Sequence, residues 1–331
     1  MRLLIKIFLA GLLLSAVAAG GLWWWAEQPM ALRSSPLDFR IAAGSSLRSA
    51  ITQMREAGVD VDPTLLALLA RANRADTAIK AGSYALNEGT TPRQLLDKLL
   101  KGKVTQGELT LVEGWTFQQW RARLDRHPDL RHDAQGLSEA QIIERLGLAV
   151  ASLEGQLYPD TYLFDKQSSD LDLLARAHRA LQRKLDAEWA QRAAGLPYKS
   201  PQEALTMASI VEKETGREAD RALVAAVFVN RLRKGMLLQT DPTVIYGLGE
   251  KFDGNLRKRD LQTDTPYNTY TRSGLPPTPI AMPGQASLRA ALNPAASEAL
   301  YFVARGDGSS VFSRTLDEHN QAVNKYQRGG K

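Results

Sequence analysis

The stretch that decides the fold is Ser200–Gly216, which reads SPQEALTMASIVEKETG. Ser200 and Glu203 have the spacing of a capping box, and Pro201 occupies the first helical position, where a missing N–H costs nothing. Gly216 is the residue type that most often ends a helix. The sequence therefore predicts one short helix that carries two glutamates in its last turn.

One of these glutamates, Glu214, falls on the apolar side of the predicted helix. At about 100° per residue, it projects between Met207 and Ile210, whereas Glu212 lies at the edge of the apolar stripe. Burial and the negative end of the helix dipole both raise the pKa of a carboxyl group, and a carboxyl group that stays protonated near neutral pH can act as a general acid. The alternative is that Glu214 pairs with a Lys or Arg from elsewhere in the chain.

Composition narrows the class of protein. The chain has 331 residues, 44% of them hydrophobic, which suits two or three domains with real cores. Its net charge of +6 favours anionic surroundings, but the basic residues are scattered, which argues against a nucleic-acid-binding protein. There is no cysteine, no GxSxG elbow and no phosphate-binding loop. We expect no metal and no cofactor, because metal-ligand spacing is also absent around the four histidines, His127, His132, His178 and His319.

The N-terminus predicts a membrane anchor. Ile7–Trp25 is nineteen residues without a charge, about the length of a bilayer-spanning helix. Trp23–Trp25 fit an aromatic belt, and the preceding Arg2 and Lys6 place the N-terminus in the cytoplasm. The alternative is a cleaved signal peptide, since SAVAAG at residues 15–20 offers small residues to a peptidase. In both cases, the bulk of the chain is expected outside the cytoplasmic membrane.

The rest of the chain predicts an α+β fold. Residues 37–86 have the pattern of a strand, two helices and a strand, and the last thirty residues predict a hairpin over Gly306–Gly308 followed by a helix. Three segments are predicted to be irregular: Glu154–Asp165, Gln239–Gly249 and Thr265–Gly284. The expected parts are an anchor with a cytoplasmic tip (1–28), a linker (29–36), a small βααβ module (37–104), a connecting α/β region (105–153) and a mainly helical domain with long loops (154–331).

The irregular segments concentrate neutral amides, hydroxyls and aromatic rings. Such side chains suit a sugar, because rings stack on the apolar face of a pyranose and amides and hydroxyls bind its OH groups. The alternative is turn chemistry, since Asn, Asp and Pro build turns in any case. The candidate sugar-binding residues are Gln239, Asp241, Tyr246, Tyr267, Asn268, Thr269 and Tyr270.

Glycoside hydrolysis normally needs two carboxylates. Near Glu214 the candidates for a second acid are Glu212, Glu218 and Asp241, and none has an obvious matching position. One acid is enough if a hydroxyl of the sugar itself attacks the anomeric carbon. The same glutamate then protonates the leaving oxygen and afterwards removes the proton of that hydroxyl.

Three runs in order, ASIVEKETG (208–216), FVNRLRKGMLLQTDPTVIYGLG (228–249) and TPYNTYTRSGLPPTPIAMPG (265–284), resemble the YceG-like family of endolytic murein transglycosylases. IKAGSYAL (79–86) and EGQLYPDTYLF (154–164) extend the resemblance toward the N-terminus. The resemblance implies a membrane-anchored periplasmic enzyme that cuts the MurNAc–GlcNAc bond within nascent glycan strands and leaves 1,6-anhydroMurNAc ends. It also implies a LysM-like module near the N-terminus and peptidoglycan synthases, the penicillin-binding proteins, as partners.

The resemblance places the catalytic acid in the EKET motif. Glu214 is preferred because a hydroxyl residue follows it, as in lysozyme-like lytic transglycosylases, and Glu212 is the alternative. The motif positions expected to line the glycan groove are Gln239, Thr240, Asp241, Tyr267, Asn268 and Tyr270. A non-catalytic peptidoglycan-binding scaffold protein is the competing hypothesis.

Overall fold

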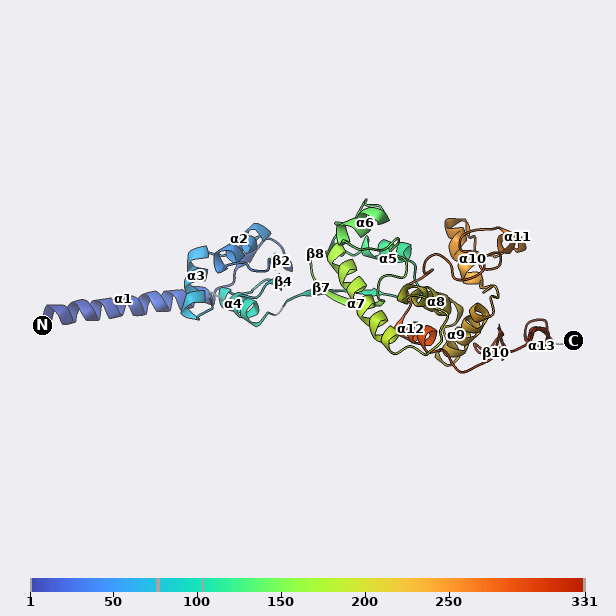
Figure 1. The fold of residues 1–331 in the computed structure, drawn as a ribbon. Coiled ribbons are helices and arrows are strands. Elements are labelled where there is room, and N and C mark those ends of the chain that lie inside the picture. Colours follow the sequence, from blue (N-terminus) through green and yellow to red (C-terminus); the bar gives the residue numbers. More distant parts are fainter. Residues whose placement is uncertain (1, 76–77, 103, 330–331) are drawn as a thin grey trace. The chain divides into compact units, whose positions relative to one another are not determined.

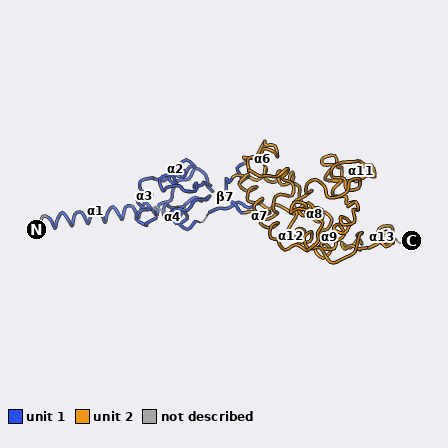
Figure 2. The backbone as a smooth tube through the Cα atoms, in the orientation of Figure 1, with its two compact units in different colours: residues 1–108, 129–131, 163–168 blue, residues 109–128, 132–162, 169–331 orange. Residues whose placement is uncertain are grey.

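The computed structural model describes residues 2–75, 78–102 and 104–329. The chain forms two compact units (Figures 1 and 2). Both helices and strands are present, which confirms the mixed helix and strand class. Unit 1 comprises residues 1–108, 129–131 and 163–168, and unit 2 comprises residues 109–128, 132–162 and 169–331.

Unit 1 begins with the apolar helix α1 (Arg2–Ala26). Its segment Leu4–Ala26 is long and apolar enough to cross a membrane, judged by length and composition. Trp23 and Trp24 are exposed, whereas Trp25 packs against the core of the unit. Trp23 and Trp24 are therefore exposed, as an aromatic belt at a membrane surface requires, and Trp25 connects α1 to the core of unit 1.

The predicted order of strand, helix, helix and strand is present in unit 1. The two strands pair antiparallel, and alternate residues of the first are buried, as expected for a strand with one face on a core. Phe39 stacks on Tyr84 across the pair, with ring centroids 5.7 Å apart. The four elements are β2 (Leu37–Ile41), α2 (Leu47–Ala57), α3 (Pro63–Ala72) and β4 (Gly82–Leu86).

Helix α4 (Pro92–Lys101) completes the core of unit 1 with buried Leu95 and Leu99. The segment predicted as a linker, residues 29–36, contains β1 (Ala31–Leu32), which pairs with β3 (Val59–Asp60). Two further strand pairs are β5 (Gln106–Leu111) with β7 (Asp160–Asp165) and β6 (Leu130–Arg131) with β8 (Ser168–Ser169).

Unit 2 is mainly helical and ends in the predicted hairpin and helix. The hairpin is formed by β9 (Tyr301–Ala304) and β10 (Ser310–Ser313), and α13 (Leu316–Tyr326) follows it. The other helices are α5 (Phe117–Leu124), α6 (Glu139–Leu146), α7 (Asp170–Ala190), α8 (Pro201–Glu214), α9 (Glu218–Arg233), α10 (Asp241–Leu248), the short 3-10 helix η1 (Gly249–Lys251), α11 (Lys258–Gln262) and α12 (Gln285–Leu292).

Helix α8 lies among the other helices of unit 2 and contacts α7, α9, α10 and α12 (Figure 1). Every residue from Ala204 to Val211 is buried, so the predicted apolar stripe underestimates the burial. Buried Ser209 also anchors the long loop before α12, because its Oγ accepts the N–H of Ile280 at 3.0 Å. The helix is covered on all sides, which leaves only its ends to reach the surface of the unit.

Helix α8 starts after Ser200 as predicted, but one bond of the capping box and the residue that ends the helix differ from the prediction. At the start, Ser200 caps the N–H of Glu203, but the Glu203 carboxylate accepts the N–H of Lys199 and not that of Ser200. At the end, the helix stops at Glu214 because Thr215 is extended, with φ −147° and ψ 128°, and Gly216 has no left-handed conformation. The helix therefore ends on the acid itself.

Two segments predicted to be irregular contain regular elements. Residues 241–248 form α10, which starts with Pro242 in its first turn, where proline is favoured. The predicted irregular segment Glu154–Asp165 ends in β7. Prolines and aromatic residues obscured both elements, since Asp-Pro is equally typical of a turn and of a helix start.

We predict that Gly155→Ala destabilises unit 2. Gly155 has φ +73°, and an added Cβ would lie 2.3 Å from the Pro279 side chain. The left-handed conformation and the overlap together lower the free energy of unfolding by roughly 2 kcal/mol or more, measured by urea unfolding of the full chain in detergent. Gly195→Ala is the control, because Gly195 has φ +70° in open space. Equal losses in the two variants would contradict the packing explanation.

Candidate active site

Glu214 is the last residue of α8 and lies on the wall of a cavity of about 490 Å³. Its Oε1 accepts a hydrogen bond from the hydroxyl of Thr240. Thr240 precedes α10 at the N-cap position, yet its side chain makes no capping bond to its own helix. The Thr240 hydroxyl donates its hydrogen bond to Glu214 instead, which links the end of α8 to the start of α10.

Burial raises the pKa of Glu214 to about 7, which is the largest effect on this group. The hydrogen bond from Thr240 acts in the opposite direction, and the charge of Asp241 raises the pKa further. Within the described parts of the chain, no Lys or Arg forms an ion pair with Glu214, so the alternative of a structural ion pair is not what the structure contains. The carboxyl group can therefore hold a proton near neutral pH.

Three other candidate residues line the cavity of Glu214: Gln239, Asp241 and Tyr270. The Tyr270 hydroxyl donates to Asp241 Oδ1 at 2.5 Å, and burial raises the pKa of Tyr270. Gln239 has a left-handed φ of 51°, which costs a non-glycine residue energy. Its N–H donates to the Thr269 carbonyl at 3.1 Å, which helps to hold that conformation.

Asn268 and Thr269 are buried in the scaffold behind the cavity. Asn268 Nδ2 donates to three carbonyls between residues 260 and 263, at 2.7 to 3.3 Å, and its Oδ1 accepts the N–H of Tyr270. Thr269 Oγ1 accepts the N–H of Thr240 at 3.1 Å. These two residues position Thr240 and Tyr270 and do not line the cavity.

Tyr246 and Tyr267 lie away from the Glu214 cavity. Their rings meet edge to face, with centroids 4.9 Å apart. The hydroxyl of Tyr267 lies 2.8 Å from Thr278 Oγ1, and Tyr246 interacts with the carboxylate of Glu154. The structure therefore brings Gln239, Thr240, Asp241 and Tyr270 to Glu214, but not these two tyrosines.

Glu212 does not line the cavity of Glu214. Its Oε2 accepts the N–H of Gly284 at 3.0 Å. Burial, followed by the charge of Glu212, raises the pKa of Glu113. Glu212 therefore supports the loop before α12, which favours Glu214 as the candidate acid.

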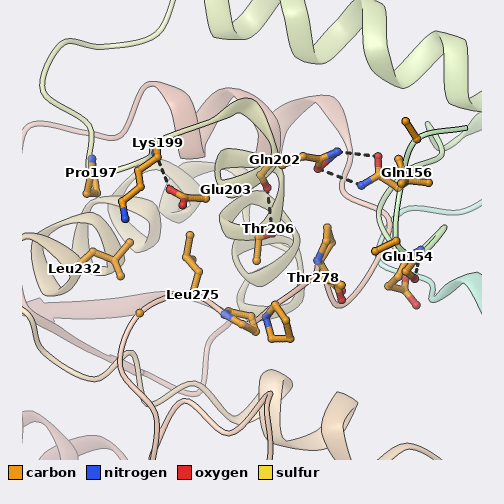
Figure 3. A pocket seen from close by; sticks show the side chains of 18 residues that line it. Glu154, Gln156, Pro197, Lys199, Gln202, Glu203, Thr206, Leu232, Leu275 and Thr278 are labelled. Carbon is orange, nitrogen blue, oxygen red and sulfur yellow. Dashed lines mark hydrogen bonds between the residues drawn. The ribbon is translucent and has the colours of Figure 1, made fainter.

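A second cavity of about 600 Å³ lies at the other end of α8 (Figure 3). The Gln156 and Gln202 side-chain amides form a reciprocal pair there, with N–O distances of 3.0 and 3.1 Å. Burial raises the pKa of Glu154 to about 7, but both carboxylate oxygens accept the N–H of Phe117 at the start of α5. Glu154 therefore caps a helix, which is a structural role for a perturbed acid.

The residues of the Glu214 cavity that sequence reasoning missed include Arg231, Tyr301 and His319. Arg231 lies within the FVNRLRKG run, and the other two come from the hairpin and the last helix. No sequence pattern distinguishes them from surface residues, since only the folded hairpin brings them to α8 and α9.

A carboxyl group with a raised pKa on a cavity wall, beside hydroxyl and amide groups, has the chemistry that an acid–base enzyme requires. The chain belongs to the YceG-like family, whose model matches residues 39–325. It is 35% identical over 274 residues to the endolytic murein transglycosylase of Bacillus subtilis strain 168, covering 76% of this chain and 74% of that protein.

Two more relatives agree with the family. An endolytic murein transglycosylase of Streptococcus pneumoniae is 27% identical over 317 residues; this match covers 86% of the chain but only 57% of that longer protein. The crystal structure of a YceG-like protein from Listeria monocytogenes is 34% identical, has a TM-score of 0.55, and matches 87% of this chain and 98% of that one.

We predict that Glu214→Gln changes how stability depends on pH. A glutamate whose pKa rises from 4.5 to about 7 on folding binds a proton more tightly in the folded state. The parent chain therefore loses stability relative to the glutamine variant as pH rises from about 4.5 to about 7, and the difference is constant above that range. Thermal unfolding midpoints of both proteins from pH 4 to 9 measure it, and parallel curves would contradict the raised pKa.

Proposed function

We propose that this chain is an endolytic peptidoglycan lytic transglycosylase that uses Glu214 as its one general acid and base. The observation that carries the proposal is the carboxyl group of Glu214, whose pKa burial raises to about 7, on the wall of a cavity. The names of its relatives support peptidoglycan as the substrate. No cofactor is needed for this reaction.

The reaction needs two proton transfers, one from Glu214 to the leaving oxygen and one from a substrate hydroxyl back to Glu214. Glu214 donates its proton to the glycosidic oxygen between MurNAc and GlcNAc, and the bond to the anomeric carbon breaks with its electron pair on that oxygen. The resulting carboxylate removes the proton of the C6 hydroxyl of the same MurNAc, and O6 bonds to the anomeric carbon. The product is a 1,6-anhydro end, no water is consumed, and Glu214 is again protonated.

The neighbours of Glu214 suit both half-reactions. The hydroxyl of Thr240 stabilises the carboxylate formed after the first proton transfer, whereas the charge of Asp241 favours the protonated form. Asp241 is itself engaged by the Tyr270 hydroxyl, which leaves Glu214 as the acid that exchanges the proton. Gln239 and Tyr270 are proposed to contact the glycan.

The proposal extends to the location and the partners of the protein. Helix α1 would anchor the chain in the cytoplasmic membrane, with the bulk of the protein in the periplasm, which the apolar segment Leu4–Ala26 supports. The antiparallel β2 and β4 with two helices between them support a LysM-like, glycan-binding module in unit 1. Peptidoglycan synthases are the proposed partners, because an enzyme that cuts nascent strands acts where those strands are made.

Glu214→Gln tests the activity directly, because glutamine keeps the shape of the side chain and removes the proton. Purified glycan strands are digested with each protein, and the ends are identified by mass spectrometry. We expect the parent to give anhydro ends and Glu214→Gln to lose at least about a hundredfold in rate. Glu212→Gln is the control and retains most of the activity.

Other outcomes distinguish the competing functions. Reducing ends would indicate a hydrolase, and binding without cleavage by the parent would indicate a scaffold protein. A Glu214→Gln variant with the parent's rate would show that another group supplies the proton.

The pH dependence provides a second prediction. Because Glu214 must start protonated and its pKa is about 7, kcat/KM falls as pH rises above about 7. Thr240→Val removes a hydrogen bond that lowers this pKa, so the alkaline limb moves to higher pH. Steady-state rates from pH 5 to 9 locate the alkaline limb of the parent and of Thr240→Val. The same alkaline limb in both proteins would exclude Glu214 as the titrating group.

A further inference from the structure

Arg231, in the last turn of α9, is a buried cation beside the candidate acid. Only 8% of the residue is exposed, and it lines the same cavity as Glu214. Its Nε donates to the Leu300 carbonyl at 2.7 Å, and its Nη1 donates to the carbonyls of Leu237 and Leu238 at 3.1 and 2.9 Å. Nη1 also lies 3.3 Å from Gln239 Oε1.

The second terminal nitrogen of Arg231, Nη2, is not used by the fold. Nη2 forms no hydrogen bond with any residue that the structure describes, and it is not among the atoms that are both fully buried and unpaired, so it keeps some contact with solvent. A guanidinium has five N–H donors in a fixed fork, and two of them are therefore available to a molecule in the cavity.

The charge of Arg231 also has no carboxylate partner among the described residues. Buried cations are usually paired with a carboxylate, since desolvation is costly. Across the described residues, no carboxylate forms a salt bridge with Arg231. The two acids of the cavity are engaged elsewhere: Glu214 accepts from Thr240, and Asp241 accepts from Tyr270.

Aromatic residues form the wall next to this cation. The guanidinium lies over the Tyr301 ring, 5.0 Å from its centroid, and Tyr301 stacks on His319 with centroids 5.2 Å apart. Burial, followed by the charge of Arg231, lowers the pKa of His319, so the histidine is neutral at pH 7. Arg231 therefore supplies a positive charge to a cavity wall whose other side chains here are aromatic rings, which suit the apolar face of a sugar.

We propose that Arg231 Nη2 binds a carboxylate carried by the muramyl residue in the Glu214 cavity, so that the site selects acidic muramyl glycan over a neutral N-acetylglucosamine polymer. The inference rests on the proposed function and adds the chemical feature of the substrate that the site recognises. A carboxylate supplies both the missing counter-charge and the acceptor for the free donors. It can be the lactyl carboxylate of an unsubstituted strand or a carboxylate of the stem peptide.

Binding to the uncleaving Glu214→Gln chain tests the inference with Arg231 intact. One arm compares peptide-free strands with free and with amidated lactyl groups, and the other compares peptide-bearing strands with free and with amidated peptide carboxylates, all of matched length. A charge-assisted hydrogen bond predicts at least about tenfold weaker binding of the amidated strand in one arm, which identifies the carboxylate. A ratio near one in both arms overturns the inference.

A second comparison assigns the preference to Arg231. Adding Arg231→Gln brings the ratio between free and amidated strands close to one, whereas the control Arg233→Gln, an exposed arginine of the same helix outside the cavity, keeps it. Thermal unfolding checks that each variant is folded, because Arg231 also holds three carbonyls. A preference that survives Arg231→Gln contradicts the inference.

The two proposals fail separately. If Glu214→Gln still cleaves strands, the proposed acid is wrong, and the carboxylate preference can be measured by the ratio of cleavage rates. If Glu214→Gln is inert but shows no preference, the transglycosylase assignment stands and the role of Arg231 is wrong.

Discussion

The burial of α8 is the constraint on which the rest of unit 2 depends. Four helices contact it, and every residue from Ala204 to Val211 is buried. Polar chemistry is therefore confined to its ends, where two cavities lie: one beside Gln202 and Thr206, the other beside Glu214. A rigid, enclosed helix holds a terminal side chain in place more firmly than a loop does, which is what an acid that must meet one bond requires.

The environment of Glu214 is made by segments that are distant in the sequence. Thr240 reaches it from the start of α10, and the backbone N–H of Thr240 is in turn held by the hydroxyl of Thr269. Asn268, the residue before Thr269, is held by hydrogen bonds from its side-chain amide to three backbone carbonyls. Residues that look like sugar ligands in the sequence are therefore partly the framework that positions the few side chains at the cavity.

A raised pKa alone does not identify the acid of this protein. Burial brings both Glu154 and Glu214 to a pKa of about 7. Both carboxylate oxygens of Glu154 accept the N–H of Phe117 at a helix start. Glu214 accepts a hydrogen bond from one hydroxyl, and it lines a cavity together with amide, tyrosine and arginine side chains. A carboxyl group with a structural role has its oxygens bound within the fold, whereas a carboxyl group that can act as an acid has an oxygen accessible to a molecule in the cavity.

The sequence by itself determined the local structure: the apolar helix α1, the βααβ order of unit 1, the start of α8 at Ser200 and the hairpin before α13, because periodicity, caps and turns act over a few residues. It also determined the family, through motifs whose order is visible in one dimension. Only the tertiary structure decided that Tyr246 and Tyr267 lie away from Glu214, that α10 is a helix, and that Arg231, Tyr301 and His319 share the cavity of the acid. These facts depend on which side chains meet across the fold, and no local pattern of residues records a meeting between segments that are distant in the sequence.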